Sequence, residues 1–230
     1  MTKKRKKRRK LKIKNIMILL LILTTIGICI YYFVTMPIKN IYLKGNNIIP
    51  DNNIIEDSNI NNYPSFLLTS NYEIEKRLKK NKYIEKVKVS KKIGNIIEIK
   101  ITEYKPIAII EKDNKIVLSS GEIVDNKYNI VDSPILTNTV DKNVYNEFIN
   151  KFSKIENNIL RQISQIEYNP TNVDKKRFLL YMNDSNMVYI TLTKIEKINK
   201  YNKIKDKIGT KTGIIYLDSG NYIELKDNKS

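Results

Sequence analysis

Few residues in this sequence have side chains that could catalyse a reaction or hold a metal ion. The 230 residues include no His and no Trp, and the single Cys, Cys29, lies inside an apolar run. A His-based catalytic triad, a His general base and a zinc site made of His or Cys are therefore excluded. A disulfide bond within the region after residue 35 is excluded as well.

One short motif resembles part of a known active site. Lys211-Thr212-Gly213 matches the Lys-Thr-Gly strand of penicillin-binding enzymes. That chemistry also needs a Ser nucleophile with Lys three residues later, and no Ser in this chain has Lys at that offset. Asp184-Ser185-Asn186 has the wrong order for the accompanying Ser-Asp-Asn element. Acyl transfer is therefore not expected.

Carboxylate pairs and phosphate-binding loops are the remaining candidates for catalysis. Two acids can hydrolyse a glycosidic bond, but the pairs Glu56 with Asp57 and Glu73 with Glu75 lie in segments that we expect to be solvated helix faces. The chain has only seven glycines and no Gly-rich phosphate loop. The sequence therefore predicts no enzymatic activity, no catalytic residue, no metal, no cofactor and no small-molecule substrate.

The clearest structural element is a predicted transmembrane helix at residues 16–35. Its uncharged run, residues 16–34, is 19 residues long, and as a helix it would cover roughly 28 Å, close to the hydrocarbon thickness of a bilayer. A cleavable signal peptide is the alternative, but no small-x-small cleavage site follows the run. We therefore predict a retained anchor.

The charge at the start of the chain predicts the orientation of this anchor. Residues 1–15 contain ten Lys or Arg and no acid, and such short segments stay on the cytoplasmic side. The expected protein is single-pass type II, with a cytoplasmic tail at 1–15 and its other domains outside the membrane. Because these residues supply +10 of the formal charge of +18, we expect the tail to attract anionic lipid and not nucleic acid.

Residues 36–105 are predicted to form a small α+β domain with helices on one face of a sheet. A strand should end at the turn Gly45-Asn46. Ser70-Asn71-Tyr72-Glu73 has the spacing of a capping box, which starts a helix. The expected order is a strand at 39–44, a short helix at 53–57, a helix at 70–80, a strand at 87–91 and a strand at 97–102.

Residues 106–226 are predicted to form a second domain, followed by a short tail at 227–230. Hydrophobic residues at spacings of three and four predict one long amphipathic helix from 143 to 166. Thr193-Lys194-Ile195-Glu196 is a second capping box, and the helix that it starts should end at Gly209. The other expected elements are a hairpin turning at Asp113-Asn114, strands at 177–182 and 187–193, and a final hairpin at 214–217 and 222–225.

Several segments together resemble the FtsQ/DivIB family of cell-division proteins. The strand from Ile41 to Asn46, the positions Leu78, Asn81, Ile84 and Val87, and the run Glu103-Tyr104-Lys105-Pro106-Ile107-Ala108 are similar to the POTRA domain of that family. The final helix and hairpin are similar to its β-domain. The chain departs from the pattern at Lys82 and at Gly94-Asn95, both in turns.

The resemblance implies a fold and a function. The fold is α+β, with a single transmembrane helix, a POTRA domain of order β-α-α-β-β, and a mixed β-sheet domain with helices. The function is that of a bitopic, non-enzymatic divisome scaffold at the septum, with FtsB/DivIC-like and FtsL-like partners. The alternatives are a membrane-tethered cell-wall-modifying enzyme with an unrecognised active site, and an anchored sensor, which the short inner tail disfavours.

The last predicted strand, 222–225, is the candidate binding site, because only polar residues follow it. An unpaired edge there would let a partner strand join the sheet through its backbone. The alternative, that Lys226-Asp227-Asn228-Lys229 merely blunts the edge, stays open. The strand Val87–Lys91 is a weaker second candidate. The expected contact residues are Tyr201, Lys205, Tyr216, Tyr222, Ile223, Glu224 and Leu225.

Overall fold

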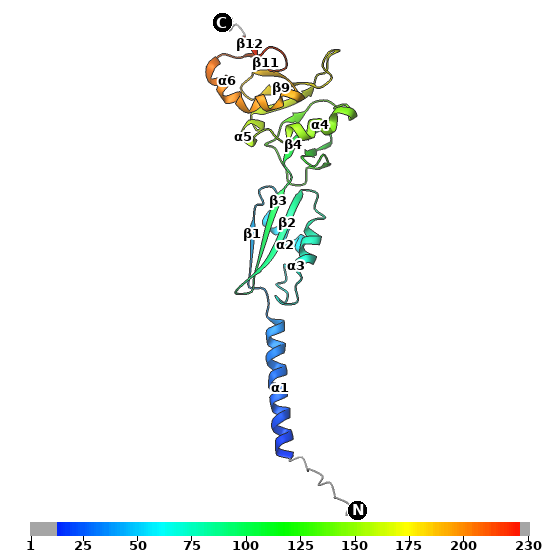
Figure 1. Ribbon diagram of the computed structural model, residues 1–230, viewed down its shortest axis with the longest axis vertical. Coiled ribbons are helices and arrows are strands. Elements are labelled where there is room, and N and C mark those ends of the chain that lie inside the picture. Colours follow the sequence, from blue (N-terminus) through cyan, green and yellow to red (C-terminus); the bar gives the residue numbers. More distant parts are fainter. Residues whose placement is uncertain (1–12, 226–230) are drawn as a thin grey trace, which may run out of the picture. The chain divides into compact units, whose positions relative to one another are not determined.

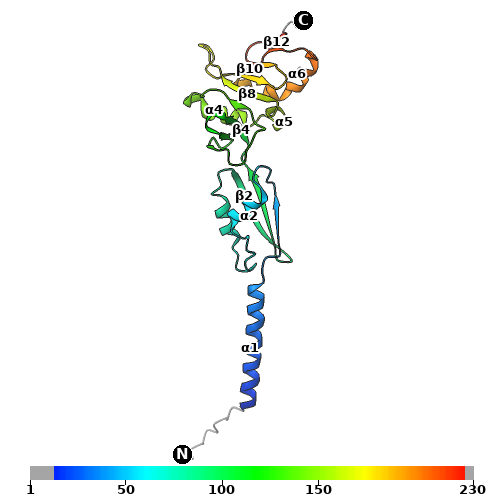
Figure 2. The same cartoon turned by 180° about the vertical axis from the view of Figure 1, so that it is seen from behind.

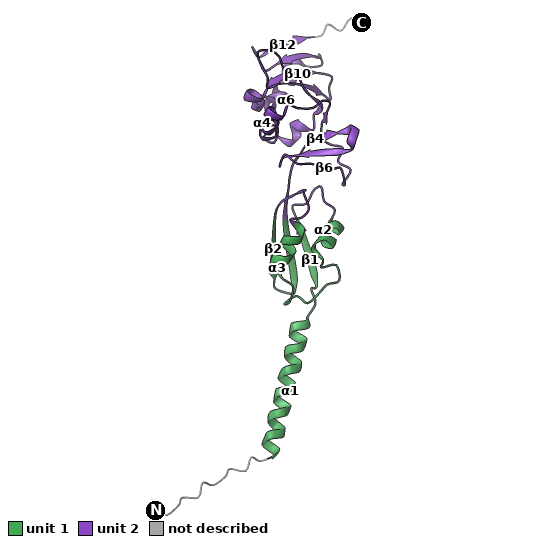
Figure 3. Cartoon of the chain, turned by 90° about the vertical axis from the view of Figure 1, so that its right-hand side faces the viewer, with its two compact units in different colours: residues 1–44, 51–78, 87–100 green, residues 45–50, 79–86, 101–230 purple. Residues whose placement is uncertain are grey.

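A computed structural model of the protein describes residues 13–225 (Figure 1). Most of the predicted tail at 1–15 and the whole of the predicted tail at 227–230 therefore lie outside the described residues. The chain divides into two compact units (Figure 3). The first unit comprises residues up to 44, 51–78 and 87–100, and the second comprises 45–50, 79–86 and the chain from 101 onward. The domain boundary predicted at residue 105 stays a prediction.

The first helix, α1 (Ile13–Thr35), is apolar and has no buried residue. Among residues 13–225 it is the one helix that is long and apolar enough to cross a membrane. The hydroxyl groups of Thr24, Thr25 and Thr35 each donate at 2.8 Å to a carbonyl oxygen three or four residues earlier. These three threonine hydroxyl groups are thus satisfied inside the helix, as a bilayer would require.

A three-stranded sheet and two helices follow α1. The sheet order is β1-β3-β2, with β1 and β3 parallel. Ile97 and Ile99 of β3 are fully buried, as are Ile54, Ile74 and Leu78 of the helices, which lie on one side of the sheet (Figure 2). The predicted order is confirmed: β1 (Asn40–Lys44), α2 (Asp51–Ser58), α3 (Asn71–Leu78), β2 (Ile84–Lys92) and β3 (Ile96–Glu103).

The second unit contains a mixed sheet of nine strands among the described residues, in the order β12-β11-β10-β9-β8-β7-β4-β5-β6. The pairs β10–β11, β7–β8 and β4–β7 are parallel. This sheet and its helices confirm the predicted fold class. The strands are β4 (Pro106–Ile110), β5 (Lys115–Leu118), β6 (Ile123–Asp125), β7 (Ile135–Leu136), β8 (Ile163–Tyr168), β9 (Arg177–Met182), β10 (Met187–Thr191), β11 (Gly213–Tyr216) and β12 (Tyr222–Leu225).

Aromatic rings form the centre of the core of this unit. Phe148 and Phe152 lie one turn apart on α4 (Lys142–Phe152), with ring centroids 4.5 Å apart. Phe178 of β9 stacks on Phe148 at 5.3 Å, and its ring centroid lies 5.5 Å from that of Phe152. All three side chains are fully buried, so α4 is fixed to the middle of the sheet.

The prediction of one long helix over 143–166 is wrong. The chain forms α4, a short helix α5 (Asn157–Leu160) and the strand β8. The pairing of β8 with β9 shifts register between Ile163 and Gln165. Such a bulge lets Ile163 and Ile166, which are three residues apart, both face the core. A spacing of three is also what a helix would give, which explains the error.

The predicted capping box at Thr193–Glu196 is also wrong, although the helix end at Gly209 is confirmed. A 3₁₀ helix, η2 (Leu192–Lys200), precedes α6 (Tyr201–Ile208), and no side chain caps η2. Its buried residues recur every three positions, which is the repeat of a 3₁₀ helix: Leu192, Ile195, Ile198 and then Tyr201. Gly209 has a positive φ of 62° and ends α6.

The turn predicted at Asp113-Asn114 is longer than expected. A 3₁₀ turn, η1 (Glu111–Asp113), joins β4 to β5, and Asn114 follows it in the left-handed region with φ of 48°. The hairpin itself is present, with β4 and β5 antiparallel.

Candidate partner-binding edge

The strand β12 forms one edge of the nine-stranded sheet. It pairs antiparallel with β11, with Tyr222 opposite Tyr216, Ile223 opposite Ile215 and Leu225 opposite Gly213. Among residues 13–225, β11 is its only neighbour in the sheet. The other side of β12 is therefore an open row of backbone donors and acceptors.

The hydrogen bonds of β11 show which backbone groups of β12 are open. The Leu217 N–H donates to the Tyr189 carbonyl at 2.8 Å, on the β10 side. Backbone groups point to alternate sides along a strand, so those of Tyr216 point toward β12 and bond its partner Tyr222. By the same alternation, the N–H and C=O groups of Ile223 and Leu225 point away from β11 and are available to another strand.

Three tyrosines form a stack across the outer face of this edge, which we call the tyrosine ladder: Tyr189, Tyr216 and Tyr222. The ring centroids of Tyr189 and Tyr216 are 5.3 Å apart, and those of Tyr216 and Tyr222 are 4.4 Å apart, with the planes inclined by 22° and 14°. Arg177 lies over Tyr189, with its guanidinium carbon 3.8 Å from the ring centroid. The ladder ends in Tyr222, which is 46% exposed.

Two polar contacts hold the ladder in place. The Tyr216 hydroxyl donates to Glu224 Oε2 at 3.2 Å. Burial, and then this hydrogen bond, raise the pKa of Tyr216 above its ordinary value. Arg177 Nε donates to Asp218 Oδ2 at 2.7 Å, which fastens the turn between β11 and β12 to β9.

Tyr201 lies beneath this surface and not on it. Its side chain is fully buried, and its hydroxyl donates to Asp184 Oδ1 at 2.7 Å. Asn186 Nδ2 donates to the Tyr201 hydroxyl at 2.9 Å, and Asn186 Oδ1 accepts from the Gly213 N–H at 2.8 Å. The predicted place of Tyr201 among the contact residues must be corrected, because its burial makes it a support for β11.

The other predicted contact residues lie at or near the edge. Tyr222, Glu224 and Leu225 are exposed, and Ile223 is partly buried against the core. Lys205 Nζ pairs with Asp184 Oδ2 at 3.0 Å and is about half exposed. Their contact with a partner stays a prediction.

The two motifs that resemble active-site elements contact each other beside the buried Tyr201. Asp184-Ser185-Asn186 and Lys211-Thr212-Gly213 are joined by the bond from the Gly213 N–H to Asn186. A Cβ atom at Gly213 would lie 2.3 Å from the Glu224 carbonyl oxygen. Glycine therefore lets β12 approach β11 closely, and the motifs have a structural role that sequence reasoning missed.

The weaker candidate, Val87–Lys91, lies in β2, which is an edge of the three-stranded sheet. The Val89 N–H in its centre donates to Glu75 Oε1 of α3 at 2.8 Å. A side chain thus occupies this edge, which is one of the ways in which proteins prevent strand addition.

Comparisons with known proteins agree with this architecture. Residues 36–104 match the FtsQ-type POTRA domain. The chain is 34% identical over 155 residues to the cell division protein DivIB of Bacillus subtilis (strain 168), an alignment that covers 65% of this chain and 59% of that protein. The chain is similar to the FtsQ/DivIB family of cell-division proteins. DivIB of Bacillus anthracis is 32% identical over 165 residues, which cover 70% of this chain and 62% of the relative.

The alignments span about three fifths of the length of these FtsQ/DivIB relatives. One solved structure, the major extracytoplasmic domain of the trans isomer of DivIB from Geobacillus stearothermophilus, has 24% identity to this chain and a TM-score of 0.39. That match covers 45% of this chain and 92% of the solved domain.

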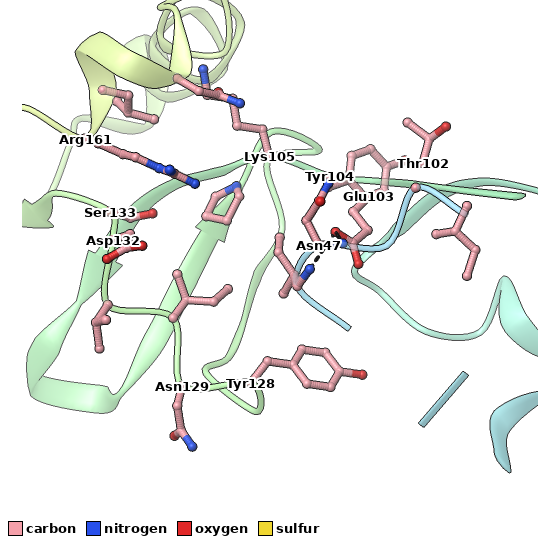
Figure 4. Close-up of a pocket in the computed structure, with 18 residues that line it drawn as sticks. Asn47, Thr102, Glu103, Tyr104, Lys105, Tyr128, Asn129, Asp132, Ser133 and Arg161 are labelled. Atoms are coloured by element: carbon pink, nitrogen blue, oxygen red, sulfur yellow. Dashed lines mark hydrogen bonds between the residues drawn. The ribbon is translucent and has the colours of Figure 1, made fainter. Parts of the chain in front are cut away.

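The run that resembles the end of an FtsQ/DivIB POTRA domain borders a hollow of about 680 Å³ (Figure 4). The Glu103 carboxylate accepts hydrogen bonds of 2.8–2.9 Å from the backbone N–H groups of residues 47–49. Lys105 Nζ donates to the Ile155 carbonyl, and burial lowers the pKa of this lysine. The acid and the lysine of this hollow therefore hold loops in place.

The stability of the second unit should fall in acid because of Asp184 and Asp218. Burial raises the pKa of both carboxyl groups, but hydrogen bonds from Tyr201 and Lys205 to Asp184, and from Arg177 to Asp218, outweigh it and hold both pKa values below the usual range. A carboxyl group whose pKa is lower in the folded protein than in the unfolded chain stabilises the fold at pH values above its unfolded-state pKa of about 3.9. This stabilisation is lost as the pH falls through the pKa of the folded state. We expect the urea midpoint to fall steeply below about pH 4.

The double variant Asp184→Asn, Asp218→Asn provides the control for this prediction. At pH 7 the double variant should be less stable than the unchanged chain. When the pH is lowered from 5 to below about 4, it should lose less of its stability than the unchanged chain does. An equally steep acid transition in the double variant would show that these two carboxylates do not govern it.

Proposed function

We propose that this chain is a membrane-anchored, non-enzymatic scaffold of the division septum that binds other division proteins outside the membrane. The matched relatives are cell division proteins, and the chain carries an FtsQ-type POTRA domain after a helix that could span a bilayer. The ten basic residues before and at the start of α1 support a cytoplasmic amino terminus. The expected topology is single-pass type II.

The observation that carries the binding proposal is the open edge of β12. A partner strand would pair with the outward backbone groups of Ile223 and Leu225, and the exposed ring of Tyr222 would contact side chains of that strand. We propose that the partners are FtsB/DivIC-like and FtsL-like division proteins. Main-chain hydrogen bonds would supply affinity, and alternate side chains would supply selectivity.

The residues that carried the enzymatic alternatives support the non-enzymatic assignment. Asn186 holds the Gly213 backbone, and Asp184 pairs with Lys205. Each group has a structural task that accounts for its position.

A binding experiment tests the scaffold proposal. The full-length chain in lipid nanodiscs should form a stoichiometric complex with a DivIC-like protein, and it should not turn over lipid-linked or polymeric wall substrate. Turnover that disappears on substitution of Ser133 or Asp132 in the hollow, without unfolding, would favour a wall-modifying enzyme. Absence of any complex with DivIC-like or FtsL-like proteins would contradict the assigned partners.

Replacement of Ile223 with proline should weaken partner binding about tenfold, because one outward N–H donor is lost. Thermal unfolding should change little, since that N–H has no partner strand within the described chain. The measurement is titration of the full-length variant in nanodiscs with the partner.

Two matched variants separate the backbone from the side chain. Ile223→Ala keeps the N–H and should retain most of the affinity. Tyr222→Pro removes an N–H that points to β11 and should destabilise the hairpin. Equal affinity of Ile223→Pro and the unchanged chain would refute strand addition at this edge.

A further inference from the structure

Exposed apolar side chains gather at one end of the first unit. Leu67 and Leu68, in the loop before α3, are 43% and 73% exposed, and Ile93 in the turn between β2 and β3 is 101% exposed. Turns normally carry polar residues, and none of these three side chains is buried in the core. We call these three residues the apolar tip.

Hydrogen bonds join the tip to the chain that leaves α1. Ser65 Oγ donates to the Val34 carbonyl at 2.5 Å, and the Phe66 N–H donates to the Met36 carbonyl at 2.9 Å. The Lys39 N–H donates to the Asn95 carbonyl at 2.8 Å. The loop that carries Leu67 and Leu68 and the turn that carries Ile93 are thus bonded within a few residues of the last turn of the helix. Figure 1 shows this loop and this turn at the α1 end of the three-stranded sheet.

The last turns of α1 have the composition of a membrane interface. Tyr31, Tyr32 and Phe33 are each more than 60% exposed, and aromatic rings of this kind concentrate at the level of the lipid headgroups. If α1 spans the bilayer, Val34 and Met36 lie at that level. The loop and the turn that bond to this segment must then lie close to the same depth.

Lysines flank the tip in the manner expected at such a surface. Lys91 Nζ donates to the Leu67 carbonyl at 3.1 Å and lies 5.1 Å from the centroid of the Phe66 ring. Lys92 is exposed beside Ile93. Apolar side chains with adjacent Lys are typical of segments that lie in the interface, where the amines reach the lipid phosphates.

We propose that Leu67, Leu68 and Ile93 insert into the outer interface of the lipid bilayer and fix the first unit against the membrane surface. This inference rests on the proposed membrane anchor. The occupant is the phospholipid interface itself, because the bonds to residues 34–39 place the tip beside the end of α1. A lipid contact at two separate segments would prevent the unit from turning freely about the helix axis.

The absence of Trp from the sequence provides a direct test. A single Trp introduced by Leu68→Trp or Ile93→Trp would be the only one in the full-length chain. Each variant is reconstituted in nanodiscs of ordinary phospholipid and of phospholipid brominated in the upper acyl chain. Val173→Trp, at a position that is 97% exposed in the second unit, is the water-exposed control. Leu21→Trp reports on α1 itself.

We expect emission from Leu68→Trp and Ile93→Trp to shift to shorter wavelength and to be quenched by the brominated lipid, while that of Val173→Trp stays unchanged. If Leu21→Trp is quenched and both tip variants behave like Val173→Trp, the proposed contact is wrong and the anchor stands. If Leu21→Trp is not quenched, the anchor itself is wrong. A blue shift without lipid quenching would indicate a protein contact and would also overturn the proposal.

Discussion

Replacement of Phe178 with alanine is expected to lower the free energy of unfolding of the second unit by about 3–5 kcal/mol. The Phe178 ring is fully buried and contacts the rings of Phe148, Phe152 and Tyr168, with centroids 5.3, 5.5 and 5.3 Å away. Its removal leaves a cavity bordered by rigid rings, which cannot close it fully. Urea unfolding of the full-length chain in detergent, followed by circular dichroism, measures the change.

The variant Phe178→Leu distinguishes a cavity from a loss of local strand structure. Leucine fills most of the space, so the loss should be roughly 1–2 kcal/mol. Because Arg177, the next residue, stacks on Tyr189 of the ladder, partner binding should fall with stability in Phe178→Ala. Equal urea midpoints for the alanine variant and the unchanged chain would contradict the assigned core.

Replacement of Gly45 with alanine is expected to destabilise the protein by roughly 3 kcal/mol or more. Gly45 has a φ of +86°, and a Cβ atom there would lie 2.2 Å from the Ile101 carbonyl oxygen. The obstructing atom belongs to the backbone of β3, so no side-chain rotation relieves the clash. The glycine of the Gly45-Asn46 turn is thus required by a close approach of two backbone segments as well as by its φ.

Gly121 is a closely matched control. Its φ is also +86°, but nothing lies within 4 Å of a Cβ atom built there. Gly121→Ala should therefore cost only about 1 kcal/mol, the penalty of the left-handed backbone alone. The difference between the two urea midpoints isolates the close approach to Ile101, and similar losses for both variants would contradict it.

Elements whose apolar or capping residues have a regular spacing were predictable from the sequence. The alternation of Ile97, Ile99 and Ile101 indicated β3, and all three residues are buried. The spacing from Ser70 to Glu73 indicated the start of α3, and the Glu73 N–H donates to Ser70 Oγ at 3.4 Å. In these segments the local pattern and the buried face agree, so no tertiary information was needed.

Segments in which the spacing of the buried residues fits two kinds of secondary structure were not predictable. Ile163 and Ile166 are spaced as in a helix, but a bulge in β8 produces the same spacing in a strand. Leu192, Ile195 and Ile198 follow the repeat of three of a 3₁₀ helix, whereas the spacing from Thr193 to Glu196 is that of a capping box and predicted an α-helix. The two-residue strand β7 is too short to show any alternation.

The candidate site was predictable only in part. The edge position of β12, which the sheet order shows, was expected because only polar residues follow that strand. The burial of Tyr201 did not follow, because its partners Asp184 and Asn186 come from a turn fifteen or more residues earlier. The apolar tip was not predictable either, since Leu68 and Ile93 approach the end of α1 only through the folded backbone.

The stacking of Tyr216 on Tyr222 has a consequence for the kinetics of recognition. If β12 receives a partner strand as proposed, it is already ordered before the encounter, so association would not require it to lose conformational entropy. That loss would fall on the incoming segment alone. Preorganisation of this kind favours rapid capture of a flexible peptide by a rigid template, and it makes the lifetime of the complex depend mainly on how well the captured segment fits.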